Sequence, residues 1–357
     1  MNNLSSEKIA IVYDWVNKWG GAERVLLTLH EMFPDAPLYT SVHNPATARW
    51  AKVFPKVYTS WLNNLPFAKS HHQWFAWAIP PAFESFNFDQ YDLVISVTSF
   101  AAKGIITKPH TRHISYCLTP TRFLWSHADH YKTALFGPLF EYLKYWDKIA
   151  SNRPDKLIAI SKTVQKRITD YYHKQSDIIY PPVDTEYFVP AENSKNDYFL
   201  CVGRMESYKN SRKIIEIFNE IEASLIVVGT GNEESKLKNI ARPNINFVGQ
   251  VNDPKLLEYY QNCKAVIFWH EEDFGIIPVE AMACGKPIMG LNQGGVSETV
   301  INNLTGILVS DDVEQLKSAI LNFDIRRFDP KVIRKRALEF SKAKFIAKLT
   351  RLCNIVI

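Results

Sequence analysis

The sequence contains few cysteines, and their positions do not suggest a metal site or a disulfide framework. Its 357 residues include five cysteines, which are scattered and never form a C-x-x-C pair. Clustered cysteines are the usual mark of zinc sites and of disulfide-rich secreted domains. Scattered ones are typical of buried thiols in a reducing compartment, so we expect a cytoplasmic protein.

Long apolar runs are absent as well. No stretch approaches the roughly 18 residues that a membrane-spanning helix requires. The polar residues 1–6 lead directly toward a strand, so we do not expect a signal peptide. The hydrophobic content of 46% and the charged content of 22% are ordinary for a globular protein, and 357 residues are most simply accommodated in two domains.

The chain also lacks blocks of like charge, although its net charge of +5 is unevenly distributed. Residues 1–180 carry 20 Lys and Arg against 14 Asp and Glu, whereas the remainder carries 22 against 23. Dispersed basic residues argue against a nucleic-acid-binding stripe. A basic first half is compatible with an anionic membrane surface or an acidic acceptor, and equally with an ordinary solvated surface.

Two series of short apolar segments alternate with turns and helical patterns. The first comprises 8–13, 38–42, 93–97, 112–117 and 157–161, and the second comprises 198–202, 224–228, 245–248, 265–269, 288–289 and 306–309. This alternation predicts α/β domains with parallel sheets and right-handed crossovers. We therefore expect two doubly wound, Rossmann-like domains that face each other across a cleft, with ligands at the carboxyl ends of the strands.

An extended segment over residues 180–188 separates the two series. It contains Pro181 and Pro182, and consecutive prolines disfavour a helix and impose an extended path. We place the domain junction here, with domains over 1–180 and 181–330. One long helix is predicted from about residue 329 to residue 352.

The most informative segment is residues 272–280, with the sequence EDFGIIPVE. Two carboxylates, Glu272 and Glu280, flank a turn at Phe274, Gly275 and Ile276 that opens a helix. Unpaired backbone N–H groups at a helix start suit an anion or sugar hydroxyls, and glycine permits a ligand to come close. Carboxylates accept hydrogen bonds from hydroxyls. The pattern indicates polyol recognition beside a phosphate, although a carboxylate pair alone could also be a solvated helix start.

Two basic residues follow the first strand of the second series. Arg204 comes directly after the strand, and Lys209 stands five residues later at a predicted helix start. An Arg can hold a phosphate with two hydrogen bonds, and a Lys adds a point charge. Together they would stabilise the negative charge that grows on a diphosphate leaving group. Because no Asp-x-Asp occurs, we expect no metal at this site; the alternative is a pair of surface cations.

Three glycine turns lie between predicted strands and helices. Gly20 and Gly21 would let a phosphate approach a helix start, or they form an ordinary turn. The turn at 229–231 lacks the acidic residue about twenty positions later that a dinucleotide fingerprint needs. The turn at 294–295 could close on a diphosphate or simply cap a helix.

Residues 272–280, which continue as AMACGKP, resemble the E-x7-E signature of retaining glycosyltransferases with the GT-B fold, the group 1 or family 4 type. The resemblance covers nearly the whole chain. It implies that Glu272 orients the donor sugar and that Glu280 binds the ribose. It also implies that Arg204 and Lys209 hold the diphosphate, and that the acceptor attacks the face from which the diphosphate leaves.

Further segments resemble the same family. Gly20 and Gly21, preceded by Asp14, match its first-domain glycine loop. Residues 247–251, which end at Val251, resemble the segment whose backbone contacts the nucleotide base. In chains of this family the last helix, here 331–357, returns to the first domain.

One segment departs from the family pattern. Residues 116–125, YCLTPTRFLW, resemble the Y-C-H-T-P-M-R-Y-x-W pattern of a subgroup concerned with O-antigen and capsule sugars. Leu118 replaces the His, which in related enzymes commonly faces the donor sugar near its 6-hydroxyl. His113 is close in sequence but projects to the opposite face of its strand, so we do not expect it to compensate. Arg122 is retained and could hold an anionic acceptor group.

An aromatic segment in the first half, with Trp74, Phe75 and Trp77, follows Lys69 and His71. One interpretation is that these rings pack short helices onto the core. The other is an interfacial patch that docks a lipid-linked acceptor, with Trp at the level of the headgroups.

Together these features predict a metal-independent, retaining hexosyltransferase of surface polysaccharide biosynthesis. We expect a GDP-, UDP- or dTDP-linked donor, no further cofactor, and a glycan acceptor that is lipid-linked and reached at the inner face of the membrane. No nucleic-acid partner is expected. The alternative hypotheses are a non-catalytic nucleotide-sugar-binding protein of the same fold and, with poorer agreement to the motifs, a GT-B phosphorylase or epimerase.

Overall fold

The computed structural model describes residues 7–126, 128 and 137–353. By the contacts between its residues, the chain divides into two units. The first comprises residues up to Tyr180 together with those from Ile346 onward, and the second runs from Pro181 to Phe345. The second unit thus extends beyond residue 330, where we had placed its end.

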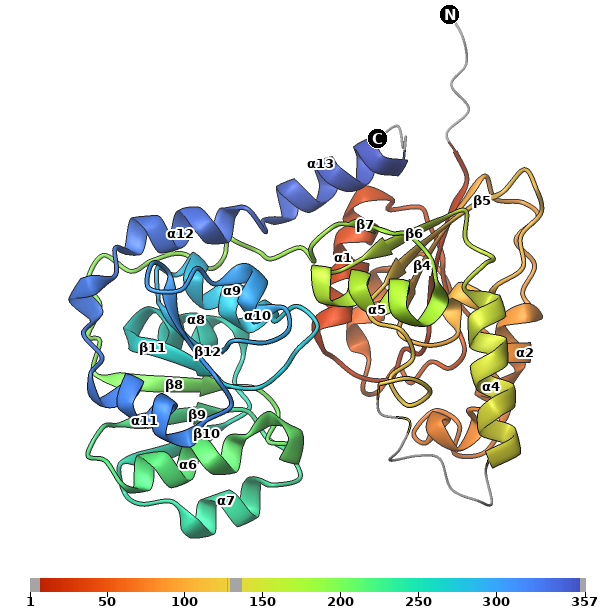
Figure 1. Cartoon of the computed structure of the whole chain (residues 1–357). Coiled ribbons are helices and arrows are strands. Elements are labelled where there is room, and N and C mark those ends of the chain that lie inside the picture. Colours follow the sequence, from red (N-terminus) through yellow and green to blue (C-terminus); the bar gives the residue numbers. More distant parts are fainter. Residues whose placement is uncertain (1–6, 127, 129–136, 354–357) are drawn as a thin grey trace, which may run out of the picture. The chain divides into compact units, whose positions relative to one another are not determined.

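The first unit is built on a seven-stranded parallel sheet in the order β3-β2-β1-β4-β5-β6-β7 (Figure 1). Its strands are β1 (Ile9–Tyr13), β2 (Leu38–Thr40), β3 (Val57–Thr59), β4 (Leu93–Thr98), β5 (Arg112–Cys117), β6 (Lys156–Ala159) and β7 (Asp177–Ile178). Its helices are α1 (Gly21–Met32), α2 (Ile79–Glu84), α4 (Gly137–Ala150) and α5 (Lys162–Tyr172), with 3-10 turns η1 (Arg49–Val53), η2 (Trp61–Asn64), η3 (His72–Phe75) and η4 (Ala102–Gly104).

The second unit has a six-stranded parallel sheet in the order β10-β9-β8-β11-β12-β13 (Figure 1). Its strands are β8 (Tyr198–Val202), β9 (Leu225–Val228), β10 (Ile245–Gly249), β11 (Cys263–Phe268), β12 (Ile288–Leu291) and β13 (Gly306–Val309). Its helices are α6 (Ser211–Asn219), α7 (Glu234–Ile240), α8 (Asp253–Asn262), α9 (Ile276–Ala283), α10 (Val296–Thr299), α11 (Val313–Leu321) and α12 (Pro330–Leu338), with η5 (Ser207–Lys209) and η6 (Ile325–Arg327). The last helix is α13 (Lys342–Cys353).

Local sequence explains most of these elements. Every residue of β4 is buried, as expected of a central parallel strand that helices cover on both faces. The Ser161 hydroxyl caps α5 by accepting a hydrogen bond from the Val164 amide at 3.0 Å. Helix α6 buries one apolar face against the core of its sheet, with Ile214, Ile217 and Phe218 nearly inaccessible. None of the described helices combines the length and the apolarity needed to cross a bilayer.

Both sheets have the strand order of a doubly wound fold. In each sheet the chain first adds strands toward one edge and then returns to add strands toward the other edge. The two directions meet between β1 and β4 in the first sheet and between β8 and β11 in the second. This confirms the predicted fold class of two Rossmann-like sheets. In such folds ligands bind at the carboxyl ends of the strands, at the point where the order reverses. The topology therefore directs attention to the loops after β1, β4, β8 and β11.

The prediction of one long helix at the end of the chain is wrong. Helices α12 and α13 are separated, because the backbone between them pairs with the extended segment that follows the proline pair. The Val183 amide donates to the Phe340 carbonyl at 3.0 Å, and the Lys342 amide donates to the Val183 carbonyl at 3.1 Å. A chain that pairs as a strand at these positions cannot continue its helical hydrogen bonds there.

Candidate functional site

The candidate donor site lies in the second unit, at the point where its strand order reverses. Arg204 follows β8 by two residues, Lys209 ends η5, and Glu272 follows β11 by four residues. Strands β8 and β11 are neighbours in the sheet although more than sixty residues separate them in sequence. The fold therefore brings the predicted cations and the first predicted carboxylate to one edge of the sheet.

Lys209 and Glu272 form an ion pair, with 2.7 Å between Lys209 Nζ and Glu272 Oε1. The Lys209 side chain is 10% exposed and that of Glu272 is 26% exposed. His270 completes the cluster, since its Nε2 lies 3.3 Å from Lys209 Nζ and 3.5 Å from Glu272 Oε1. The His270 ring rests on Phe268, with centroids 4.1 Å apart. Our sequence reasoning had not identified His270, whose only signal was its place two residues before Glu272.

The electrostatics of this cluster fix its charge state. Burial would raise the pKa of Glu272, but the adjacent His270 and the charge of Lys209 outweigh burial and hold that pKa well below its usual range. Burial lowers the pKa of His270, and the contact with Glu272 opposes this shift. Near neutral pH, Glu272 is therefore ionised and His270 is neutral, so the imidazole can accept a hydrogen bond from Lys209.

Arg204 differs from Lys209 in being exposed. Its side chain has no hydrogen-bond or ion-pair partner among the residues that the structure describes. The preceding Gly203 has a φ of 139°, and a Cβ at that position would lie 3.8 Å from Lys209 Nζ. The start of the Arg204 loop thus runs close to the Lys209 ammonium. Because Arg204 is exposed, it is the cation that an incoming anion can reach first.

Two glycine turns hold the backbone around these charges. A Cβ at Gly229 would lie 2.1 Å from the carbonyl oxygen of Gly203, so this turn packs directly on the Arg204 loop. The Gly295 amide donates to the Glu272 carbonyl at 2.8 Å, and a Cβ at Gly294 would lie 2.5 Å from the same oxygen. Gly295 is the N-cap of α10, which confirms the interpretation that this turn caps a helix. The turn at 294–295 also supports the backbone of Glu272, a role that we had not predicted.

The turn after Glu272 opens α9. Gly275 is the N-cap in the left-handed region, with a φ of 83°, and Ile276 is the first, half-buried residue of the helix. The Phe274 side chain is only 3% exposed and its ring packs on Phe340, with centroids 5.7 Å apart. Phe274 can therefore offer a ligand its backbone but not its ring.

The positions predicted to contact ribose and base also lie in the second unit. Glu280 in α9 is 2% exposed and accepts a hydrogen bond from the hydroxyl of Tyr260 at 3.0 Å. Val251 is half-buried in the loop between β10 and α8. The ribose contact of Glu280 and the base contact of Val251 stay predictions.

In the first unit, Gly20 and Gly21 are exposed at the start of α1, as a ligand-binding loop requires. The third residue of that helix, Glu23, is nevertheless buried, and one of its carboxylate oxygens would lie 3.1 Å from a Cβ at Gly20. Glu23 also accepts a hydrogen bond from the Tyr13 hydroxyl at 3.1 Å. The N-cap Gly20 has no side chain to cap the helix, and the Glu23 carboxylate already lies at the helix start where we had considered a phosphate.

The assignment of Asp14 as a substrate-binding residue needs correction. Asp14 is fully buried after β1, and its carboxylate accepts hydrogen bonds from four successive backbone amides after β4, at 2.6–3.0 Å. Both oxygens are thereby engaged in joining the two strands at which the sheet order reverses. Asp14 is a structural carboxylate that a ligand cannot reach.

Leu118 and Arg122 lie in the segment that follows β5, and both are half-buried. The Leu118 amide donates to the Thr98 carbonyl at 2.8 Å, which places it beside the end of β4. His113 is fully buried and bonds Ser96 across the sheet, with Nε2 2.9 Å from the hydroxyl oxygen. His113 is thus engaged within the sheet and does not replace the missing family His.

The segment around Arg122 is anchored to a buried carboxylate that sequence reasoning missed. Asp147 in α4 is fully buried and accepts hydrogen bonds from Thr121 at 2.7 Å and from Trp125 at 2.8 Å. It also binds Lys103 at 2.6 Å and the Tyr172 hydroxyl at 2.7 Å. Asp147 therefore holds the motif on both sides of Arg122.

The aromatic segment does not belong to the core as a whole. Phe75 packs against the core, but Trp74 is 65% exposed and Trp77 is 52% exposed. Core packing therefore explains Phe75 and leaves the two tryptophans on the surface.

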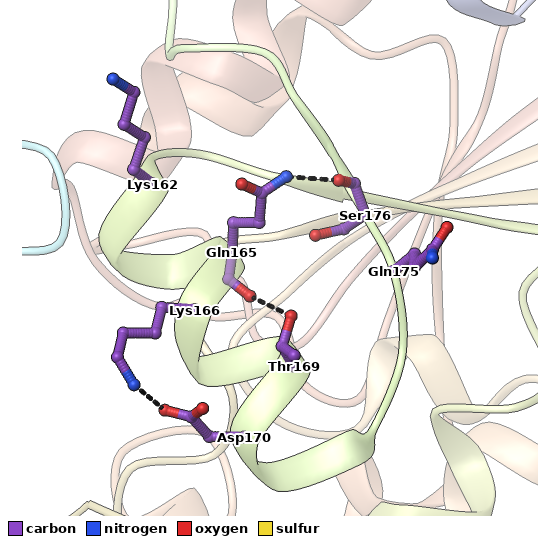
Figure 2. Close-up of a pocket in the computed structure, with 7 residues that line it drawn as sticks. All are labelled: Lys162, Gln165, Lys166, Thr169, Asp170, Gln175 and Ser176. Carbon is purple, nitrogen blue, oxygen red and sulfur yellow. Dashed lines mark hydrogen bonds and ion pairs between the residues drawn. The ribbon is translucent and has the colours of Figure 1, made fainter.

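A hollow of about 430 Å³ in the first unit lies apart from all of these residues (Figure 2). It follows α5 and is lined by Lys162, Gln165, Lys166, Thr169, Asp170, Gln175 and Ser176. Lys166 is paired with Asp170 at 2.6 Å, and Gln165 donates to the Ser176 carbonyl. We assign it no role.

Within the described residues, no cluster of His, Cys, Asp and Glu side chains could hold a metal ion.

Two family models match consecutive parts of the chain. The model described as glycosyl transferases group 1 matches residues 183–336, and the model described as glycosyltransferase family 4 matches residues 19–187. Among similar curated proteins, the O-antigen chain mannosyltransferase RfbU of Salmonella typhimurium is 26% identical over 54% of this chain and 59% of its own length. The capsular polysaccharide biosynthesis glycosyltransferase CapM of Staphylococcus aureus is 28% identical over 48% and 52%. These alignments thus span little more than half of each relative.

Solved structures show the same fold over the whole chain. Anabaena Alr3699/HepE in complex with UDP superimposes with a TM-score of 0.73 at 17% identity, covering 98% of this chain and 100% of that chain. The sucrose-phosphate synthase of Thermosynechococcus elongatus gives a TM-score of 0.76 at 16% identity, covering 97% and 98%. At these identities the similarity establishes the fold.

Proposed function

Because this chain belongs to the GT-B glycosyltransferases of group 1 and family 4, we propose that it transfers a hexose from a nucleoside diphosphate sugar to a glycan acceptor with retention of configuration. The observation that carries the proposal is the cluster at the strand reversal of the second unit. There Lys209 and Glu272 are paired at 2.7 Å, and the nearby Arg204 has no partner among the residues that the structure describes. A diphosphate and a sugar need this combination of cations and a hydrogen-bonding carboxylate.

The charges suggest how a donor is held. Arg204 meets the diphosphate first, since it is exposed and has no competing partner within the described part of the chain. Lys209 carries three donors, so it can keep its bond to Glu272 and still reach a phosphate oxygen. Ionised Glu272 then accepts hydrogen bonds from sugar hydroxyls. The two cations stabilise the charge that develops on the departing diphosphate, which lowers the barrier to transfer.

The names of related proteins support the wider setting of the proposal. One relative is an O-antigen chain mannosyltransferase and another acts in capsular polysaccharide biosynthesis. A related structure contains UDP-glucose. We propose a role in surface polysaccharide assembly with a GDP-, UDP- or dTDP-linked donor, and a lipid-linked acceptor reached from the membrane surface.

The decisive experiment is transfer of radiolabelled sugar from each nucleotide donor, screened first by the rise in melting temperature that each donor produces. Replacing Arg204, Lys209 or Glu272 by Ala should each lower the rate about a hundredfold, because a charge-assisted contact to the transition state is worth about 3 kcal/mol. Arg212→Ala is the matched control, since Arg212 is exposed on α6 and forms an ion pair with Glu216 on the same helix. Near wild-type turnover in the Arg204 or Glu272 variant would overturn the proposal.

The same assay tests the rival hypothesis and the role of metal. A non-catalytic nucleotide-sugar-binding protein would show donor-induced stabilisation without transfer or hydrolysis of label.

We further propose that Arg204 and Lys209 make a divalent ion unnecessary. Transfer should persist in excess chelator; loss of activity that Mg²⁺ or Mn²⁺ restores would contradict this part of the proposal.

A further inference from the structure

We propose that Phe67, His71, Trp74 and Trp77 of the first unit form a docking surface for an anionic lipid bilayer. We refer to these four residues as the aromatic surface. The inference rests on the proposed function, because it identifies the face through which the protein would reach a lipid-linked acceptor.

The aromatic surface is exposed, and three of its four rings lie against one another. Phe67 is 68% exposed, Trp74 65% and Trp77 52%. The rings of His71 and Trp74 stack with centroids 4.4 Å apart, and the Phe67 ring lies 6.4 Å from Trp74 and 6.5 Å from His71. Single exposed apolar side chains are ordinary, but a contiguous group of large rings is typical of an interaction site. Trp in particular concentrates where a protein meets lipid headgroups.

Phe67 is held in a conformation that its side chain does not favour. Its φ is 63°, in the left-handed region where a bulky residue is an outlier. The Phe67 carbonyl accepts hydrogen bonds from the amides of Ser70 and His71, so the surrounding turn requires this backbone. Glycine or asparagine would suit the position with less strain. Because the Phe67 ring is exposed, packing within the protein does not account for its presence, whereas contact with a bilayer does.

The stretch of chain that carries the aromatic surface has charge of one sign. Residues 36–83 contain no Asp or Glu, whereas the chain average of 37 acidic residues in 357 would place about five in these 48 positions. The same stretch carries four basic residues that are all exposed: Arg49, Lys52, Lys56 and Lys69. Basic side chains near aromatic rings match the phosphate-bearing surface of an anionic membrane.

Hydrogen bonds join the segment that carries the aromatic surface to the loop between β1 and α1. The Asn17 side chain donates to the Lys69 carbonyl at 3.2 Å and lies 2.9 Å from His72 Nδ1. The Trp15 ring stacks on His72, with centroids 4.5 Å apart. This loop ends at the exposed Gly20 and Gly21. A bilayer bound to the aromatic surface would therefore bring the headgroup of a lipid-linked acceptor toward the glycine pair.

The test is co-sedimentation with vesicles of phosphatidylcholine alone or mixed with phosphatidylglycerol. The wild-type protein should bind the mixed vesicles more tightly, and added salt should weaken this binding. The Phe67→Ser, Trp74→Ser, Trp77→Ser variant should bind at least about tenfold more weakly because apolar area is lost. Lys69→Glu should weaken binding at least about fivefold on the mixed vesicles. The matched control is Leu304→Ser, Leu321→Ser, which removes two exposed apolar side chains from the second unit and should change nothing.

Equal binding by the triple variant and the wild type, with circular dichroism and melting temperature preserved, would overturn the inference, as would a wild type that binds neither vesicle. Light scattering supplies a further outcome: a wild-type dimer that the triple variant abolishes would make a second copy of the chain the occupant and would also overturn it. Stabilisation by UDP or GDP separates the two proposals. The triple variant should keep the stabilisation by nucleotide. If the wild type is not stabilised by either nucleotide, the proposed function is contradicted, and vesicle binding still decides whether the aromatic surface binds a bilayer.

Discussion

At the scale of single residues, the candidate donor site is almost neutral before a ligand arrives. Lys209 and Glu272 balance each other at 2.7 Å, and His270 is held uncharged beside them. Of the two cations in this site, Arg204 is the one whose charge has no partner among the described residues. We therefore expect donor binding to depend on the position of the Lys209 ammonium between Glu272 and His270.

His270 can be tested by whether its replacement retains a hydrogen-bond acceptor. His270→Leu removes the acceptor 3.3 Å from Lys209 Nζ and should lower kcat/KM for the donor about tenfold, because a hydrogen bond to a charged group contributes about 1.5–3 kcal/mol. His270→Gln keeps an acceptor oxygen and should retain most of the activity. Steady-state kinetics with varied donor decide the matter, and equal loss in both variants would show that only the volume of the side chain matters.

Leu118 bears on the choice of donor sugar. If it stands where the family His meets the 6-hydroxyl, a hydroxylated donor leaves that group unpaired at a cost of about 1–3 kcal/mol, whereas a methyl group packs against the leucine. We therefore predict a preference for a 6-deoxy donor, such as a rhamnosyl or fucosyl nucleotide, or for a pentose. Competition between a hexose donor and its 6-deoxy counterpart on the same nucleotide measures this preference. A preference for the 6-hydroxylated sugar that Leu118→His leaves unchanged would refute the prediction.

At the scale of elements, helix α4 positions the segment after β5 through one carboxylate. Asp147 bonds Thr121 and Trp125 on either side of Arg122, and it neutralises Lys103, which is 1% exposed. A buried ion pair of this kind contributes little net stability, but removal of one partner leaves an uncompensated charge. The network therefore ties the fold of the first unit to the placement of Arg122.

Two substitutions separate these roles. Asp147→Leu should lower the free energy of unfolding by about 3–5 kcal/mol because Lys103 loses its counter-charge. Trp125→Phe removes the 2.8 Å bond to Asp147 but keeps an aromatic ring beside Tyr171. It should raise the KM for the acceptor while leaving the KM for the donor unchanged. Trp146→Phe is the matched control, since it removes a 2.7 Å bond to Glu84 that does not involve the segment around Arg122. A rise in acceptor KM in both tryptophan variants would contradict the positioning role.

At the scale of the whole molecule, buried neutral histidines couple stability to pH. Burial, assisted by Lys18, lowers the pKa of His72 to about 4, and burial, assisted by Arg153, lowers the pKa of His113 to about 3. In the unfolded chain both groups titrate near the ordinary value of about 6.5. Between these values the unfolded state binds more protons than the folded state, so stability falls as the pH falls.

We predict that each of these histidines costs about 2 kcal/mol of unfolding free energy when the pH is lowered from about 6.5 to about 5. Urea unfolding at several pH values measures this loss. The His113→Gln variant should be less stable at neutral pH, because its bond to Ser96 is altered, yet its stability should decline less steeply with acid. An identical pH slope in variant and wild type would show that His113 does not contribute.

The sequence by itself determined the features that depend on residues close together in the chain. The alternation of apolar segments and helical patterns predicts both sheets, because strand and helix periods are local properties. The family could likewise be identified from the sequence, because its motifs are pairs of residues close together in the chain. These pairs are Glu272 with Glu280 and Arg204 with Lys209. The strands that were missed, β3 and β7, have three and two residues, too few to carry a period, and their pairing with neighbours creates them.

Only the tertiary structure decided how residues distant in sequence meet. It surrounds the Asp14 carboxylate with backbone amides more than eighty positions away. It brings Asp147 into hydrogen-bond contact with the segment around Arg122, and it brings the turn at 294–295 into contact with the Glu272 backbone. It likewise leaves Trp74 and Trp77 exposed while it buries Phe75. The physical reason is that burial and long-range hydrogen bonding depend on the order of strands in the sheet, which the local pattern of residues does not contain.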